Sequence, residues 1–244
     1  MPSIINKPMD VKKMFENLTL ESMEKTKINI LRENTSTRPS VELIKYNGHE
    51  AVVKDFSRCS FIYKNTIGRI ITFREKKAYK KIEGIKGVPR LYKDIAGYVL
   101  VVEKIDGTDL RILRKKRGEI DPVFFDKLNE LVKKCHERGI VHCDMRKAAN
   151  IIKGKDSSPF LIDWGAAIFQ KEMRFPILNL IYKRLKKEDF RAVIKLKLRF
   201  CPSAVSLQEK ETFFYQDNLE KFARTVRNTG QKWLKKIFKY LAFF

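Results

Sequence analysis

The sequence predicts an α+β protein. Three observations carry this prediction. Strand-like patterns fill residues 28–54, the clearest amphipathic helix covers 121–138, and three short apolar runs between Ile140 and Gly165 each border a polar side chain. Strands that precede helices along a chain are typical of α+β folds. At 244 residues and 43% hydrophobic content, the chain can bury the core of one two-lobed unit or of two small domains.

The first lobe is predicted from its strand patterns. Residues 1–26 form an extension that we interpret as a helical cap, and strands are expected at 28–33, 40–46 and 51–56. Asn47-Gly48 joins the last two strands and is a strong hairpin signal. A helix is expected from Thr66 to Ile82, followed by a buried strand over 98–105.

The second lobe begins with the helix Asp121 to Arg138, which has an aspartate at its N-cap and Pro122 in its first turn. Gly139 ends this helix and leads into the stretch from Ile140 to Gly165. There, Asp144 and Asp163 each follow an apolar run, and Asn150 precedes a third. Buried carboxylates are costly unless a positive group meets them. A magnesium ion between Asn150 and Asp163 would meet that need and leave Asp144 able to receive a proton.

The charge of the chain is unusual. Lysine and arginine number 52 against 29 acids, which gives a formal net charge of +23. This excess predicts an anionic partner, whether a nucleotide, a nucleic acid or a lipid surface.

Cysteine usage and apolar run lengths predict the compartment. The four cysteines have no paired spacing, which argues against a zinc site or a disulfide framework and favours a reducing compartment. No signal-peptide core or membrane-spanning run is recognisable, so the expected location is the cytoplasm, with peripheral attachment to the inner membrane as an option.

The stretch around the two aspartates resembles a known family. His142-Cys143-Asp144, Asn150 and Asp163-Trp164-Gly165 follow the order of the catalytic and metal-binding loops of the protein-kinase fold. The asparagine comes one residue later than in protein kinases, and tryptophan replaces phenylalanine. These variants resemble the heptose and Kdo kinases of the lipopolysaccharide core, which lie close to the RIO-type atypical kinases.

The resemblance implies a two-lobed protein-kinase-like fold with a reduced C-terminal lobe. The expected organisation is an extension at 1–26, an N-lobe at 27–103, a C-lobe at 104–212 and a basic amphipathic helix at 213–244. The segments 75–91 and 189–202 also resemble this family. No long activation loop follows Gly165, and the 79 residues after it are too few for the large helical lobe that docks peptides in protein kinases.

The resemblance also implies a nucleotide site in the first lobe. Lys54 would hold the phosphates of ATP and Glu75 would hold Lys54, with Glu83 as a competing partner. The backbone from Glu103 to Ile105 would hydrogen-bond the adenine. The loop 34–40 lacks glycine, so the hydroxyl groups of Thr35, Ser36 and Thr37 would contact phosphate; an ordinary polar turn is the alternative.

In the second lobe, the resemblance assigns the transfer chemistry. Asp144 would accept or orient the proton of the attacking hydroxyl, and Arg146 would meet the transferring phosphoryl group, with Lys147 as a weaker candidate. Asn150 and Asp163 would hold Mg²⁺. His142 is expected to orient the loop through hydrogen bonds.

The last 26 residues carry a helical pattern. Apolar residues of the segment 219–244 recur at steps of three and four, with lysines and arginines between them. This pattern predicts either an anchor on an anionic membrane surface or a helix docked on the second lobe.

Together these features predict an ATP- and Mg²⁺-dependent kinase that phosphorylates a hydroxyl group. The favoured acceptor is a heptose or Kdo sugar of a glycolipid, the lipopolysaccharide inner core. The alternatives are a RIO-type protein serine/threonine kinase whose basic surface faces RNA or the ribosome, and a catalytically inactive scaffold.

Overall fold

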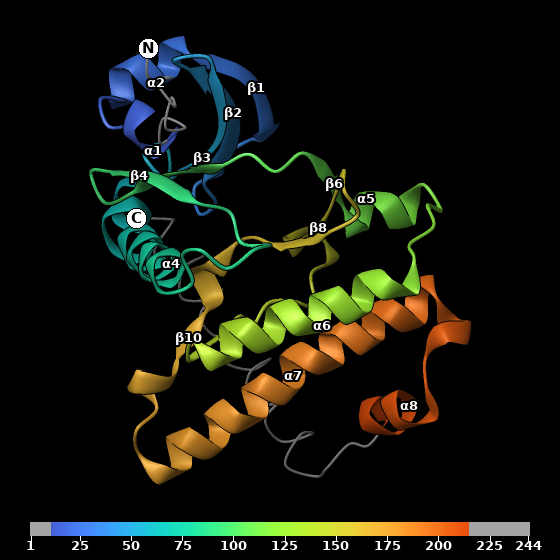
Figure 1. The fold of residues 1–244 in the computed structure, drawn as a ribbon. Coiled ribbons are helices and arrows are strands. Elements are labelled where there is room, and N and C mark those ends of the chain that lie inside the picture. Colours follow the sequence, from blue (N-terminus) through green and yellow to red (C-terminus); the bar gives the residue numbers. More distant parts are fainter. Residues whose placement is uncertain (1–10, 215–244) are drawn as a thin grey trace, which may run out of the picture.

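A computed structural model describes residues 11–214, so the predicted helix 219–244 lies outside the described residues. The first lobe is built on a five-stranded antiparallel sheet with the strand order β1-β2-β3-β5-β4 (Figure 1). Its strands are β1 Lys27–Arg32, β2 Ser40–Tyr46, β3 His49–Asp55, β4 Leu91–Ile95 and β5 Val99–Glu103. The second lobe is mainly helical, so the predicted α+β fold is confirmed.

The hairpin between β2 and β3 forms where the sequence predicts it. Tyr46 pairs with His49, and the pairing continues without a shift to Ser40 and Asp55. Asn47 and Gly48 both have positive φ, 48° and 81°. Two consecutive residues with positive φ are what a tight type I′ turn needs, and Asn-Gly adopts them readily.

Residues 11–26 cover one face of the sheet. They form two short helices, α1 Val11–Met14 and α2 Leu20–Lys25. Phe15, Leu18 and Met23 are buried in the same core as strand residues of β2, β3 and β5. Phe15 also stacks on Tyr92 of β4, with ring centroids 4.8 Å apart. The predicted cap is therefore an integral part of the first core.

The helix after β3 begins earlier than the sequence indicates. It runs through α3 Phe61–Tyr63, the π-helical turn η1 Lys64–Gly68 and α4 Arg69–Lys81. A side chain at Gly68 would meet Phe56 at 3.2 Å, so glycine permits the close approach at this turn. Strand β4 was not predicted, because the residues of Leu91–Ile95 alternate poorly between apolar and polar.

The second lobe packs two long helices side by side, α6 Pro122–Glu137 and α7 Pro176–Phe200 (Figure 1). The Asp121 carboxylate caps α6 by accepting from the Val123 amide at 2.8 Å, as predicted. The remaining elements are β6 Gly107–Asp109, α5 Leu110–Lys115, β7 Ile140–Val141, η2 Ala148–Asn150, β8 Ile151–Gly154, β9 Pro159–Leu161, η3 Trp164–Ala166, β10 Ile168–Phe169, η4 Gln170–Glu172, η5 Pro202–Ala204 and α8 Leu207–Phe214.

One hydrophobic core crosses the border between the lobes. Ala78 and Tyr79 of α4, with Ile82 just after it, are buried together with residues of α6, α7, β7 and η3. Helix α4 thus packs on the second lobe as well as on the sheet. Within residues 11–214, no helix has both the length and the apolar character that crossing a membrane would need.

Candidate active site

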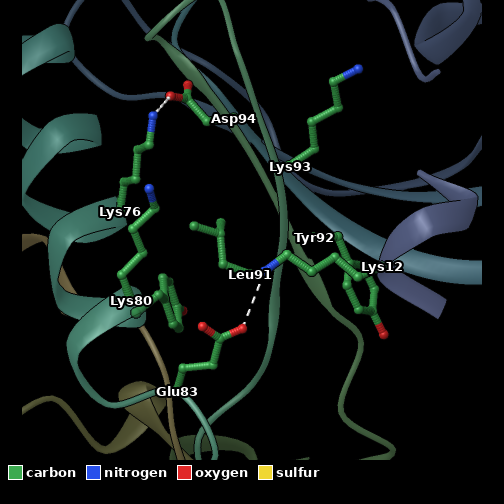
Figure 2. A pocket seen from close by; sticks show the side chains of 9 residues that line it. Lys12, Lys76, Lys80, Glu83, Leu91, Tyr92, Lys93 and Asp94 are labelled. Atoms are coloured by element: carbon green, nitrogen blue, oxygen red, sulfur yellow. Dashed lines mark hydrogen bonds and ion pairs between the residues drawn. The ribbon is translucent and has the colours of Figure 1, made fainter. Parts of the chain in front are cut away.

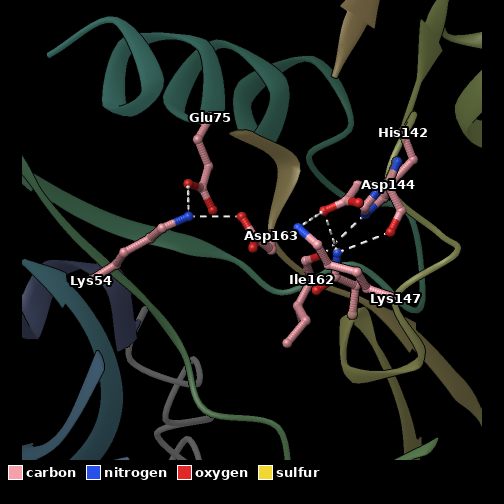
Figure 3. Close-up of polar contacts among 8 residues, drawn as sticks. Lys54, Glu75, His142, Asp144, Lys147, Ile162 and Asp163 are labelled. Carbon is pink, nitrogen blue, oxygen red and sulfur yellow. Dashed lines mark hydrogen bonds and ion pairs between the residues drawn. The ribbon is translucent and has the colours of Figure 1, made fainter. Parts of the chain in front are cut away.

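A lysine links two carboxylates at the junction of the lobes. The Lys54 ammonium lies 2.6 Å from Oε2 of Glu75 and 2.7 Å from Oδ1 of Asp163 (Figure 3). Strand β3 supplies the lysine, α4 supplies the glutamate, and Asp163 comes 109 residues after Lys54. The competing candidate, Glu83, pairs with Lys12 instead. The sequence-predicted Lys54, Glu75 and Asp163 are therefore together in space.

The backbone around Asp163 explains how its side chain reaches the lysine. Asp163 has φ 63° and ψ 70°, a left-handed conformation that a short polar side chain tolerates better than most. Gly165 follows, and a Cβ there would lie 3.0 Å from Ile71 of α4. Because glycine has no side chain, η3 can pack directly against the helix that carries Glu75.

Burial and charge act in opposite directions on these three groups. Burial alone would raise the pKa of Asp163, but the Lys54 ammonium outweighs burial and lowers this pKa to about 2. Burial would lower the pKa of Lys54, whereas Glu75 and Asp163 together raise it. Burial raises the pKa of Glu75, partly offset by Lys54. The net effect keeps the lysine charged although its own side chain and that of Glu75 are largely buried.

The loop after β7 brings Asp144 toward Asn150. The Asn150 amide group donates to the Asp144 carbonyl and to its Oδ2, each at 3.1 Å. Lys147 donates to the same Oδ2 at 2.6 Å (Figure 3). Asp144 is thus held by two donors, and its second carboxylate oxygen is left for another partner.

His142 orients this loop from a buried position. Its Nε2 bonds to the Ile162 carbonyl at 3.0 Å, and its Nδ1 accepts from the Asp144 amide at 3.3 Å. These bonds require the hydrogen to sit on Nε2. The ring also packs on Trp164, with centroids 4.5 Å apart. His142 therefore joins the segment that holds Asp144 to the segment that holds Asp163.

Sequence reasoning missed Asp189, a buried residue of α7. Its carboxylate accepts from the backbone amides of His142 at 2.8 Å and Cys143 at 3.0 Å, and from His136 Nε2 at 3.1 Å. Cys143 has φ 63°, which is unfavourable for a side-chain-bearing residue and needs such support. In the sequence, Asp189 lies in a basic helix and looks like a solvated charge.

Arg146 is predicted to meet the transferring phosphoryl group, and in the structure its side chain contacts α7. Its guanidinium pairs with Glu188 of α7, so the side chain is directed to the helix. Lys147, the weaker candidate from sequence, is the cation that contacts Asp144. Arg146 and Lys147 are neighbours in the loop, and their spacing in the sequence does not show which of the two faces Asp144.

The donor set around Asp163 and Asn150 suits a magnesium ion. Lys54 occupies Oδ1 of Asp163, which leaves Oδ2, and the Asn150 nitrogen faces Asp144, which leaves the amide oxygen. Mg²⁺ prefers such oxygens and is commonly held by one or two protein ligands plus phosphate. Within residues 11–214, no three His, Cys, Asp or Glu side chains gather as a metal cluster.

The other predicted nucleotide contacts are placed as follows. Thr35 pairs with Arg38 across the loop. The Ser36 carbonyl accepts from the Ser60 amide at 3.1 Å, so the loop contacts the residue that precedes α3. The Glu103 amide donates to the Arg90 carbonyl at 2.8 Å. That N–H is therefore unavailable to adenine, and the predicted contacts of Glu103 must come from its carbonyl or from the residues up to Ile105.

A pocket of about 250 Å³ lies elsewhere, between α1, α4 and β4 (Figure 2). Its charges are largely paired: Lys76 donates to Asp94 at 2.5 Å, and Lys12 donates to Glu83 at 3.1 Å. Of the residues considered for the nucleotide site it includes only Glu83, the competing partner of Lys54, and it includes none predicted for the metal.

The chain matches the model of one known protein family. A family model described as the RIO domain matches residues 21–179, which is more than half of the chain. The chain belongs to the RIO family. RIO domains are atypical kinases and ATPases, so the kinase-type fold and the general class of enzyme agree with the sequence analysis.

Two archaeal relatives are similar to about half of this RIO chain. Both are described as "Probable bifunctional tRNA threonylcarbamoyladenosine biosynthesis protein", from Methanosarcina barkeri (27% identity over 128 residues, 51% of this chain) and Methanosarcina mazei (29% over 129 residues, 52% of this chain). The matched region is 22% of the length of each relative. These matches support the RIO part of the resemblance and lend no support to a lipopolysaccharide kinase.

Proposed function

We propose that this RIO protein is an ATP- and Mg²⁺-dependent phosphotransferase that transfers the γ-phosphoryl group to a hydroxyl. The observation that carries the proposal is the Lys54 bridge to Glu75 and Asp163, which faces a loop bearing Asp144 and Asn150. Phosphoryl transfer depends on positioning and charge stabilisation, and these residues supply both.

Each residue has a role in this proposal. Lys54 holds the phosphates, and Glu75 keeps Lys54 in place. Asp163 and Asn150 hold Mg²⁺, which would neutralise charge on the phosphates when bound. Asp144 orients the acceptor hydroxyl and receives its proton. Backbone groups up to Ile105 hold the adenine, and the hydroxyls of the loop 35–37 contact phosphate.

Lys147 replaces Arg146 in the role of the cation nearest the transferred group. Its ammonium already lies 2.6 Å from Asp144, whereas Glu188 holds the Arg146 guanidinium on α7. A positive group near the equatorial oxygens stabilises the charge that develops during transfer.

The first candidate acceptor is a serine or threonine hydroxyl of a protein, with RNA nearby. Membership of the RIO family and the tRNA-related descriptions of the two relatives support it. The formal charge of +23 fits a protein that works beside a polyanion. A glycolipid sugar is the second candidate, favoured by the exposed apolar and basic face of α7 described below.

The test is turnover of ATP by the purified chain with and without Mg²⁺. Asp163→Asn and Lys54→Met should each lower turnover at least 100-fold, because each removes a charge on the phosphates or the metal. The matched control Lys76→Met alters a lysine of the same lobe that pairs with Asp94 outside this site. Equal turnover by all four proteins would show that the site does not act on ATP, and would favour the scaffold alternative.

The acceptor is identified by mass. Labelled ATP is added to ribosomes with bound RNA and, separately, to extracted glycolipid, and the phosphorylated product is analysed by mass spectrometry. Phosphoserine or phosphothreonine supports the first candidate, and a phosphorylated sugar supports the second. The Asp163→Asn protein serves as the blank for both reactions.

A further inference from the structure

Helix α7 consists of two halves that differ in what covers them. From Asp189 onward, six residues are buried, and Asp189 itself holds the catalytic loop. In the half before Asp189, Tyr182 is the one buried residue. Figure 1 shows the first turns of α7 extending past the end of α6. This first half therefore presents most of its surface to solvent.

The exposed surface of the first half is apolar. Ile177 is 76% exposed, Leu180 is 64% exposed and Ile181 is 44% exposed, and Phe175, just before the helix, is 73% exposed. Ile177, Leu180 and Ile181 stand three and four residues apart, so they share one face of the helix. We call these four residues the α7 apolar row. A contiguous exposed row marks an interaction surface more often than single apolar residues do.

Basic residues stand at both ends of the α7 apolar row, four of them in the turns that follow it. Residues 173–187 contain five cationic side chains and no acid: Arg174, Lys183, Arg184, Lys186 and Lys187. A helix that combines an apolar face with lysine and arginine along its flanks lies in the interface of anionic lipid bilayers. Each basic residue near such a surface adds about 1 kcal/mol of attraction.

We propose that the first half of α7 binds an anionic membrane surface, with the α7 apolar row inserted at the lipid boundary. Charge complementarity selects this occupant over others. Residues 215–244 carry seven basic and two acidic side chains, so they would be repelled, as would a second copy of this chain. A nucleic acid would satisfy the lysines and leave the aliphatic side chains in water.

The membrane-facing half leads directly to the catalytic loop. Ile181, Arg184 and Glu188 follow one another at steps of three and four along the same face, and Glu188 pairs with Arg146. Ile181 and Glu188 are separated by about 10 Å along the helix axis. An acceptor carried in the membrane would therefore reach the loop of Asp144 from the lipid side. This last step rests on the second acceptor of the proposed function, a glycolipid sugar, whereas membrane binding does not.

The test is flotation of the full chain with phosphatidylcholine vesicles, with and without phosphatidylglycerol. Binding is expected only with phosphatidylglycerol, and about 1 M salt should weaken it because charges are then screened within about 3 Å. Ile177→Ser with Leu180→Ser should lower the vesicle affinity at least tenfold. The matched control, Ile70→Ser with Phe73→Ser, changes two side chains of similar exposure on α4 and should leave affinity unchanged.

Other results would overturn the proposal. Equal vesicle binding by the α7 variant and the parent would place the contact elsewhere, for example in residues 215–244. RNA binding without vesicle binding would assign the basic surface to nucleic acid. A lower unfolding midpoint of the α7 variant, with no change in vesicle affinity, would show that another part of the chain covers the α7 apolar row. ATP turnover, measured in parallel, reports on the active site separately.

Discussion

Replacing Asp189 with asparagine tests whether α7 holds the loop that bears Asp144 in place. The carboxylate accepts three hydrogen bonds, two at Oδ2 and one at Oδ1. An asparagine has only one acceptor oxygen, so its amino group must face at least one of the three N–H donors. Buried hydrogen bonds to charged groups contribute about 1.5–3 kcal/mol each, so Asp189→Asn should lower the free energy of unfolding by about 2–3 kcal/mol.

Two assays on the same protein measure the consequence. Urea unfolding reports stability, and Mg²⁺-dependent ATP turnover below the unfolding transition reports the position of the loop. Turnover should fall in the folded Asp189→Asn protein, because His142 and Cys143 lose the anchor that precedes Asp144. The control Asp126→Asn, at a side chain that is 66% exposed, should change stability by less than about 0.5 kcal/mol.

The anchoring role would be refuted by either of two results. An unchanged free energy of unfolding would mean that the three hydrogen bonds contribute nothing net. A destabilised protein with full turnover, measured while it is folded, would mean that the loop keeps its shape without Asp189.

Three further predictions concern the site. Lys147→Ala should lower kcat about 100-fold and Arg146→Ala less than about fivefold, since Lys147 contacts Asp144 and Arg146 pairs with Glu188. A larger loss of kcat in Arg146→Ala than in Lys147→Ala would instead support Arg146 as the cation at the transferring phosphoryl group. Glu75→Gln should lower kcat/KM for ATP at least tenfold and Glu83→Gln should not; equal effects would contradict the ion-pair assignment. The lowered pKa of Asp163 stabilises the fold above about pH 4, and this stability is lost as pH falls toward the folded-state pKa of about 2. Over this pH range the free energy of unfolding of the parent should therefore fall by about 1 kcal/mol more than that of Asp163→Asn. This value is reduced for solvent screening, because the Asp163 side chain is 37% exposed. Parallel curves of unfolding free energy against pH for the two proteins would contradict the prediction.

The sequence predicted the parts of the fold that depend on local chemistry. The Asn47-Gly48 turn needs positive φ at two residues, and Asp121-Pro122 begins a helix through a cap and a fixed φ. Asp144, Asn150 and Asp163 could be singled out because their order within residues 140–165 resembles the loops of the protein-kinase fold. These features could be read without knowing which segments meet in space.

What was missed depends on tertiary contacts. Asp189 acts on amides 46 and 47 residues earlier, and no local pattern distinguishes it from the other charges of a basic helix. Whether Arg146 or Lys147 faces Asp144 depends on Glu188, which lies 42 residues beyond Arg146. Strand β4 forms because β5 pairs with it, despite its weak alternation. The acceptor preferred from sequence rested on resemblance, and the RIO match favours the alternative.

The shared core of α4 and the second lobe determines which parts can turn as one body. Ala78, Tyr79 and Ile82 fasten the glutamate-bearing helix to the same interior as α6 and α7. If the sheet rotates relative to the second lobe, Glu75 will keep its position relative to Asp163, and Lys54 will move with β3. Opening of the lobes would therefore lengthen the distances from the Lys54 ammonium to the Glu75 and Asp163 carboxylates together.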